Sequence, residues 1–144
     1  PQTTRYKIRG IVSRPESQIV FIDTPGVHKP GYLLNRRMMA AVEDAVLSVD
    51  VVVLIRDANV STGNGDRFVL DLVKRSGKPA ILLLNKIDKL KAEETLLPLI
   101  DFYRNEHDFA AIIPASALKG EAVETLLGAI EEHLPEGEPL FDED

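Results

Sequence analysis

The length, composition and charge of the chain are those of an ordinary globular protein. Its 144 residues, 44% of them hydrophobic and 28% charged, suffice for one domain with a core. The absence of cysteine excludes a disulfide framework and a thiolate metal site, and a net charge of −6 argues against the whole chain binding a polyanion. No apolar run approaches the roughly 18 residues of a membrane span, and no signal peptide opens the chain. A cytoplasmic location is therefore predicted.

Apolar runs alternate with helical patterns along most of the chain. The apolar runs predict strands at 6–12, 18–23, 51–57, 79–85 and 110–116. Apolar spacings of three and four residues predict helices at about 33–48, 64–76, 92–106 and 121–133. Gly77 with Pro79, and Pro135, are helix-stop signals. This alternation predicts an α/β fold with a mostly parallel sheet and flanking helices, and the nearly continuous apolar strands predict a sheet covered on both faces.

Polar residues gather where these strands are expected to end. In a parallel α/β sheet, ligands bind at the carboxyl ends of the strands. The polar groups at these ends are Asp23-Thr24-Pro25-Gly26, Arg56-Asp57, Asn85-Lys86-Ile87-Asp88 and Ser116-Ala117. They are the candidate site.

The stretch 85–88, Asn-Lys-Ile-Asp, suits recognition of guanine. The carboxylate of Asp88 can accept hydrogen bonds from two adjacent N–H donors, which guanine offers and adenine does not, so adenine would be rejected. The stem of Lys86 can lie along the base plane, and the amide of Asn85 can tie neighbouring loops together. By itself, this short pattern also fits a strand end that leads into a helix.

Three further stretches suit a nucleotide and its metal ion. Asp23 at a strand end suits Mg²⁺ through a water, and Gly26 lets a backbone N–H approach a phosphate oxygen. The threonines of 1–5, PQTTR, offer a hydroxyl for Mg²⁺. The backbone N–H of Ala117 can reach a base carbonyl. Taken singly, these stretches also fit turns or a polar arm.

With these motifs in this order, the chain resembles GTPases of the translation-factor-related superfamily and, within it, the bacterial Era family. The matching stretches are PQTTRYKIRGI, DTPGVHKP, LLNRRMMAAV, NKIDKL, LPLIDFY, IIPASALKG and EEHLPEGEPLFDED. The resemblance implies a P-loop NTPase-type GTPase domain over 1–134. It also implies that 135–144 is an acidic linker towards a KH-type RNA-binding domain, which this chain does not contain, and no GXXG loop is present.

The resemblance also implies roles for individual residues. Thr4, with Thr3 as the alternative register, matches a Mg²⁺ ligand, Asp23 matches the water-mediated Mg²⁺ partner, and Gly26 matches the γ-phosphate contact. The residues that match base-binding positions are Asn85, Lys86, Asp88, Ser116, Ala117 and Leu118. Val27 stands where other GTPases carry a glutamine that orients the attacking water, so we expect slow intrinsic turnover.

The function implied by the resemblance is a GTP-hydrolysing switch that acts in assembly of the small ribosomal subunit. Its ligands would be Mg²⁺ and GTP or GDP. Its partners would be 16S rRNA and the 30S subunit, reached through the KH domain, with peripheral membrane association as a further option and no DNA.

One departure from the family pattern concerns the phosphate loop. The sequence contains no Gly-x-x-x-x-Gly-Lys-Ser/Thr, so the chain is expected to lack the first strand and P-loop helix of the family. The absent strand would leave an unpaired slot in the sheet, with apolar surface exposed on the neighbouring strands. Alone, the chain is expected to bind GTP very weakly and to show no turnover.

Two other interpretations of the chain's function are also consistent with the sequence. The chain could be a non-catalytic GTPase-like remnant that serves as a protein-binding module. It could also be a receiver-like or nucleotide-free α/β domain of the flavodoxin type. That last reading predicts acidic residues after the first strand, and the sequence has Ser13-Arg14 there.

Overall fold

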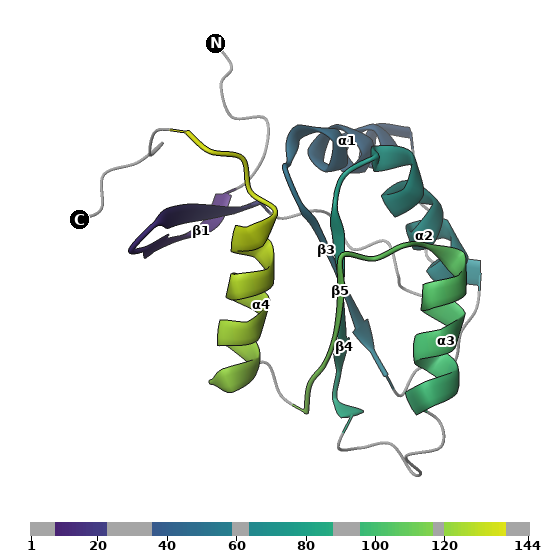
Figure 1. Ribbon diagram of the computed structural model, residues 1–144. Helices are drawn as coiled ribbons and strands as arrows, with labels where there is room; N and C mark the ends of the chain where they lie inside the picture. The colour runs from purple at the N-terminus through teal and green to yellow at the C-terminus, as the bar shows by residue number, and fades with distance from the viewer. Residues whose placement is uncertain (1–7, 23–35, 59–63, 88–95, 117–119, 138–144) are drawn as a thin grey trace.

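The computed structural model describes residues 8–22, 36–58, 64–87, 96–116 and 120–137 (Figure 1). The strands are β1 (Ile8–Arg14), β2 (Ser17–Ile22), β3 (Val52–Asp57), β4 (Ala80–Asn85) and β5 (Ala111–Pro114). The helices are α1 (Arg36–Ser48), α2 (Asn64–Ser76), α3 (Leu96–Glu106) and α4 (Glu121–Glu132). Every predicted strand and helix is therefore present, with ends that differ from the prediction by a few residues.

Strands β3, β4 and β5 form the predicted parallel sheet, with β4 in the middle. The side chains of β4 point alternately to the two faces, and residues 80–84 are all almost fully buried. On one face, Ile81 and Leu83 pack against α4, and on the other, Leu82 and Leu84 pack against α2 and α3. The prediction that helices cover both faces is confirmed for β4.

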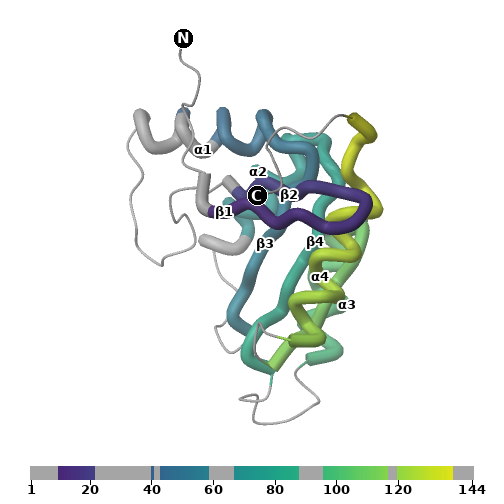
Figure 2. The backbone as a smooth tube through the Cα atoms, turned by 90° about the vertical axis from the view of Figure 1, so that its left-hand side faces the viewer, coloured from purple at the N-terminus to yellow at the C-terminus, as the bar shows by residue number. Residues whose placement is uncertain are grey.

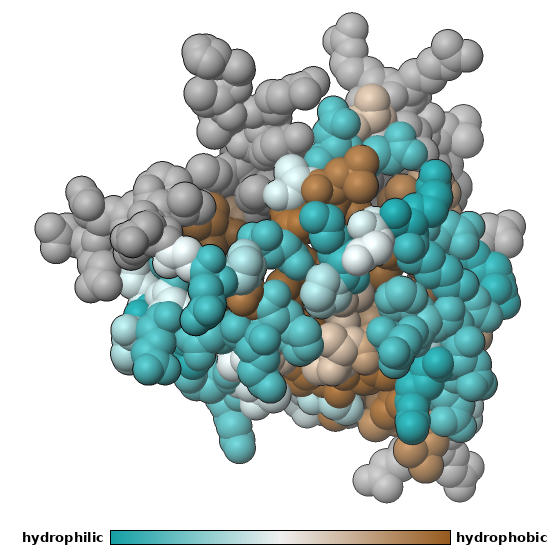
Figure 3. Space-filling view, turned by 45° about the horizontal axis from the view of Figure 1, so that its top comes forward, coloured by the Kyte–Doolittle hydropathy of each residue, from teal (hydrophilic) through white to brown (hydrophobic). Residues whose placement is uncertain are grey.

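The helices on the second face are joined by ion pairs at the surface. Lys74 of α2 lies 3.2 Å from Glu106 of α3, and Arg75 lies 3.4 Å from Glu43 of α1. Helix α2 ends where Gly77 adopts a left-handed φ of +68°, which a glycine takes without strain, as the predicted stop signal requires. Figure 3, which brings the upper end of the molecule forward, shows polar residues on the left and right of the coloured surface, with exposed apolar residues between them.

The first two strands form an antiparallel hairpin, which the sequence analysis did not predict. Only Pro15 and Glu16 separate β1 from β2, so there is no room for the crossover that parallel strands need, and a tight turn pairs them antiparallel. Ile19 of this hairpin is buried and packs in the same cluster as Leu83 and Leu126. In Figure 2 the hairpin crosses in front of the parallel strands.

Among the described strands, the hairpin and the parallel sheet are not hydrogen-bonded to each other. Within the described ranges, β3 pairs with β4 on one side only, and Ile55, in the apolar first part of β3, is 51% exposed. The prediction of a sheet covered on both faces is therefore wrong for this part of β3. The exposure of Ile55 agrees with the expected apolar surface beside β3, and the absence of a strand from the sheet stays a prediction.

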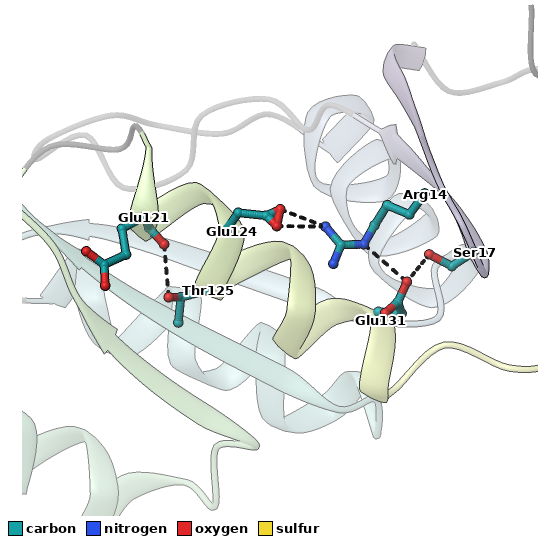
Figure 4. Close-up of polar contacts among 6 residues, drawn as sticks. All are labelled: Arg14, Ser17, Glu121, Glu124, Thr125 and Glu131. Atoms are coloured by element: carbon teal, nitrogen blue, oxygen red, sulfur yellow. Dashed lines mark hydrogen bonds and ion pairs between the residues drawn. The ribbon is translucent and has the colours of Figure 1, made fainter.

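Polar contacts hold the hairpin against α4 (Figure 4). The Nε and Nη1 atoms of Arg14 each donate to a carboxylate, at 3.1 Å from Glu131 Oε2 and 3.1 Å from Glu124 Oε2. The hydroxyl of Ser17 also donates to Glu131. This hydroxyl, together with the Arg14 guanidinium, lowers the pKa of the Glu131 carboxyl below its ordinary value. The two glutamates likewise raise the pKa of Arg14.

These contacts predict an acid-sensitive contribution to stability. Because the folded-state pKa of Glu131 is lowered, the stabilisation is fully present above the unfolded pKa of about 4.3 and is lost as the pH falls through the folded-state value. Glu131→Gln should therefore lower the free energy of unfolding at neutral pH, and the difference from the unaltered chain should shrink on acidification. Urea unfolding across this pH range tests it. Glu132→Gln, on an exposed side chain of the same helix, is the control, and an equal loss there would contradict the assignment.

Candidate functional site

The carboxyl ends of the three parallel strands are held together by backbone hydrogen bonds. Asp57 and Asn85 are paired in register at the ends of β3 and β4. The Ala58 N–H donates to the Asn85 carbonyl at 2.9 Å, and the Ala115 N–H donates to the Leu84 carbonyl at 2.8 Å. The segments that follow β3, β4 and β5 therefore start side by side, at the lower edge of the sheet in Figure 1.

Lys86 has a left-handed backbone conformation, which is uncommon for residues other than glycine. Its φ is +63°, and in the described part of the chain only glycines share this left-handed region. The turn brings the Ile87 N–H to the Ala115 carbonyl, at 3.1 Å. The chain after β4 is thus bonded to the chain after β5, and the orientation of Lys86 is set by bonds on both sides.

The ammonium of Lys86 lies 3.3 Å from Asp57 Oδ2, which joins the end of β4 to the end of β3. Asp57 itself follows a buried arginine, since Arg56 is only 6% exposed. The guanidinium of Arg56 lies 5.7 Å from the centre of the Tyr103 ring and donates from Nη1 to the Asp57 carbonyl at 2.8 Å. The backbone that carries the Asp57 carboxylate is therefore anchored in the core.

Asn85 offers an acceptor that the described protein groups do not use. Its Oδ1 atom is buried and has no hydrogen-bond partner among the described residues. A buried amide oxygen without a donor is costly, so such an atom generally meets a donor from a ligand, a loop or water. Asn85 Oδ1 is therefore an acceptor for a donor that the described residues do not supply.

Three of the predicted site residues lie at the carboxyl edge of the parallel sheet, and the other six lie outside the described residues. Asn85 is the last residue of β4, Lys86 directly follows it, and Ser116 is exposed two residues after β5. The predicted residues that lie outside the described ranges are Thr4, Asp23, Gly26, Asp88, Ala117 and Leu118. The individual roles of all nine stay predictions.

The described ranges contain no group of three His, Asp or Glu side chains that could hold a metal ion, and the two predicted Mg²⁺ positions are outside them. No helix in those ranges is long and apolar enough to span a membrane.

Asp57 lies at the edge where the sequence predicts it, whereas its pairing with Lys86 was not predicted. The sequence feature that could have indicated this pair is that Asp57 and Lys86 both come just after the apolar runs of neighbouring strands. Which of the polar residues would meet depends on the register between β3 and β4, and that register is set by packing over the whole sheet.

Comparison with known proteins agrees with this architecture. The family model described as "Elongation factor Tu GTP binding domain" matches residues 2–136, and the chain belongs to this family of GTP-binding domains. Over all 144 residues the chain is 44% identical to GTPase Era from Trichlorobacter lovleyi, of which it spans 48%. The predicted resemblance to Era is thus confirmed, and the chain spans about half the length of the curated relative it matches.

Two solved structures of Era share the fold. One, in complex with MgGDPNP and nucleotides 1506–1542 of 16S ribosomal RNA, has a TM-score of 0.79 and 36% identity, over 99% of this chain and 49% of that one. The other, a point variant of Aquifex aeolicus Era bound to GDP and AlF₄⁻, has a TM-score of 0.78 and 35% identity, over 98% of this chain and 48% of that one. The predicted P-loop GTPase fold class is confirmed.

Proposed function

We propose that this chain is the guanine-recognising and switch part of an Era-type GTPase that converts GTP to GDP and phosphate. The observation that carries the proposal is the hydrogen-bonded edge that joins Asn85, Lys86 and the segment at Ser116, in a chain 44% identical to GTPase Era.

In this proposal each side chain has a binding or positioning task. Asp88 accepts hydrogen bonds from the guanine N–H groups, the Lys86 stem covers the base plane, and Ala117 with its neighbours Ser116 and Leu118 contacts the base carbonyl. Asn85 ties these segments together.

The phosphates are assigned to a second group of residues. Gly26 donates a backbone N–H to the γ-phosphate, and Thr4 and Asp23 hold Mg²⁺, which neutralises charge on the phosphates when bound. Val27 can neither take nor give a proton, so it does not activate water. Slow turnover follows from this assignment.

The wider role is also a proposal. One Era structure is a complex with MgGDPNP and nucleotides of 16S ribosomal RNA, and another is bound to GDP and AlF₄⁻; both support a GTP-dependent role in small-subunit assembly. We place 16S rRNA and 30S contacts in a KH-type domain beyond the linker 135–144, and we place the protein in the cytoplasm, with peripheral membrane association as an option and no DNA partner.

A nucleotide titration tests the central proposal. A fluorescent GTP analogue with Mg²⁺ is titrated into the 144-residue chain, and into the same chain joined to the residues that precede the matched stretch in the Trichlorobacter lovleyi relative. Because the sequence has no phosphate-cradling loop, we expect binding by the joined chain alone, displaced by GTP and not by ATP. Tight, micromolar binding by the 144 residues would contradict the first expectation.

The same titration can overturn the nucleotide proposal. If neither chain binds the analogue while both remain folded by circular dichroism, the motifs do not form a nucleotide site. The alternative proposal, a non-catalytic protein-binding module, would then replace the GTPase.

A further inference from the structure

Asp57 and Lys86 meet at the rim of the sheet although 28 other residues separate them in the chain. The side chains are 34% and 49% exposed, and their closest charged atoms are 3.3 Å apart. An exposed ion pair of this kind contributes at most about 1 kcal/mol to stability, so stability alone is a weak reason for it. Its geometry suggests a different role.

Lysine is ordinarily a poor platform for a ligand because its four-carbon stem samples many rotamers. Here both ends of the residue are held. The left-handed backbone of Lys86 lies between two bonded positions, the Asn85 carbonyl that accepts from Ala58 and the Ile87 N–H that donates to Ala115. At the far end, the ammonium rests against Asp57. The apolar stem between these two points therefore samples fewer rotamers than that of a lysine with a free ammonium.

We propose that Asp57 is a positioning residue for nucleotide binding, which holds the Lys86 stem in place to cover the face of a purine base. This rests on the proposed function, and it adds a residue that does not touch the ligand itself. A side chain ordered before binding loses less conformational entropy on binding, and this strengthens affinity. Because Asp57 acts through the stem and not at the base edge, it raises affinity for different purines equally.

The core supports this role on the β3 side. Arg56 donates to the Asp57 carbonyl and lies over the ring of Tyr103. This ring is buried in the same hydrophobic cluster as Leu82 and Leu84. The backbone that carries the carboxylate is therefore anchored in the core. The Asp57 carboxylate therefore has a fixed attachment point from which it can bind the Lys86 ammonium.

The experiment uses whichever chain binds GTP in the titration above. Asp57→Asn, which keeps the shape and removes the charge, should weaken GTP and inosine triphosphate by the same factor, about two- to fivefold. The ratio of the two affinities should not change. Asp57→Glu should bind more tightly than Asp57→Asn because it keeps the charge. Asp71→Asn, on an exposed carboxylate of α2, is the matched control and should leave both affinities unchanged.

A double-mutant cycle separates positioning from a general effect on the fold. In a Lys86→Met background, Asp57→Asn should no longer alter GTP affinity, because the group it acts through has lost its charge. An unchanged affinity in the single variant, or an undiminished effect in the Lys86→Met background, would overturn the inference. Failure of the unaltered chain to bind GTP would instead overturn the proposed function, so the two failures are distinguishable.

Discussion

In a GTP-binding form of this chain, Asp88→Asn should move the nucleotide preference from GTP towards xanthosine triphosphate, by on the order of a hundredfold in the affinity ratio. The carboxylate accepts from N–H donors, whereas the asparagine amide can donate to the carbonyl that xanthine carries in place of the guanine amino group. Competition of GTP and xanthosine triphosphate against a fluorescent analogue measures the ratio.

Two outcomes of this competition are informative. Asp101→Asn, on an exposed carboxylate of α3, should keep the preference for guanine and serves as the control. If Asp88→Asn also kept the full guanine preference, Asp88 would not read the base, and the assignment of the stretch 85–88 would be wrong.

Leu83→Ala should lower the free energy of unfolding by about 3 kcal/mol. Leu83 is fully buried in the middle strand, and its side chain packs in the cluster that joins the sheet, α4 and the hairpin residue Ile19. Removing it leaves a cavity that the rigid sheet cannot close. Urea unfolding followed by circular dichroism measures the loss.

The matched control for this substitution is Leu97→Ala. The Leu97 side chain is 67% exposed on α3, so its truncation should change the free energy of unfolding by less than about 0.5 kcal/mol. Similar losses for the two variants would show that β4 is not the centre of the core.

Local patterns were sufficient to predict the secondary structure. The apolar run that became β4 and the stop signal at Gly77 act over a few residues, and both gave the observed elements. The predicted strand end at Asn85, with Lys86 directly after it, is also observed. The antiparallel hairpin was also predictable, because only Pro15 and Glu16 separate its two strands, which is too short for a crossover between parallel strands.

Tertiary structure decided which of these local features meet. Ile55 lies in the apolar part of β3, yet it is half-exposed, because among the described strands only β4 pairs with β3. Arg14 meets Glu131 across 117 positions, and Lys86 meets Asp57 across a strand register. A local pattern specifies the period and ends of an element within a few residues. Contacts between distant elements depend instead on how side-chain volumes pack across the whole core, and no short stretch of the chain contains that information.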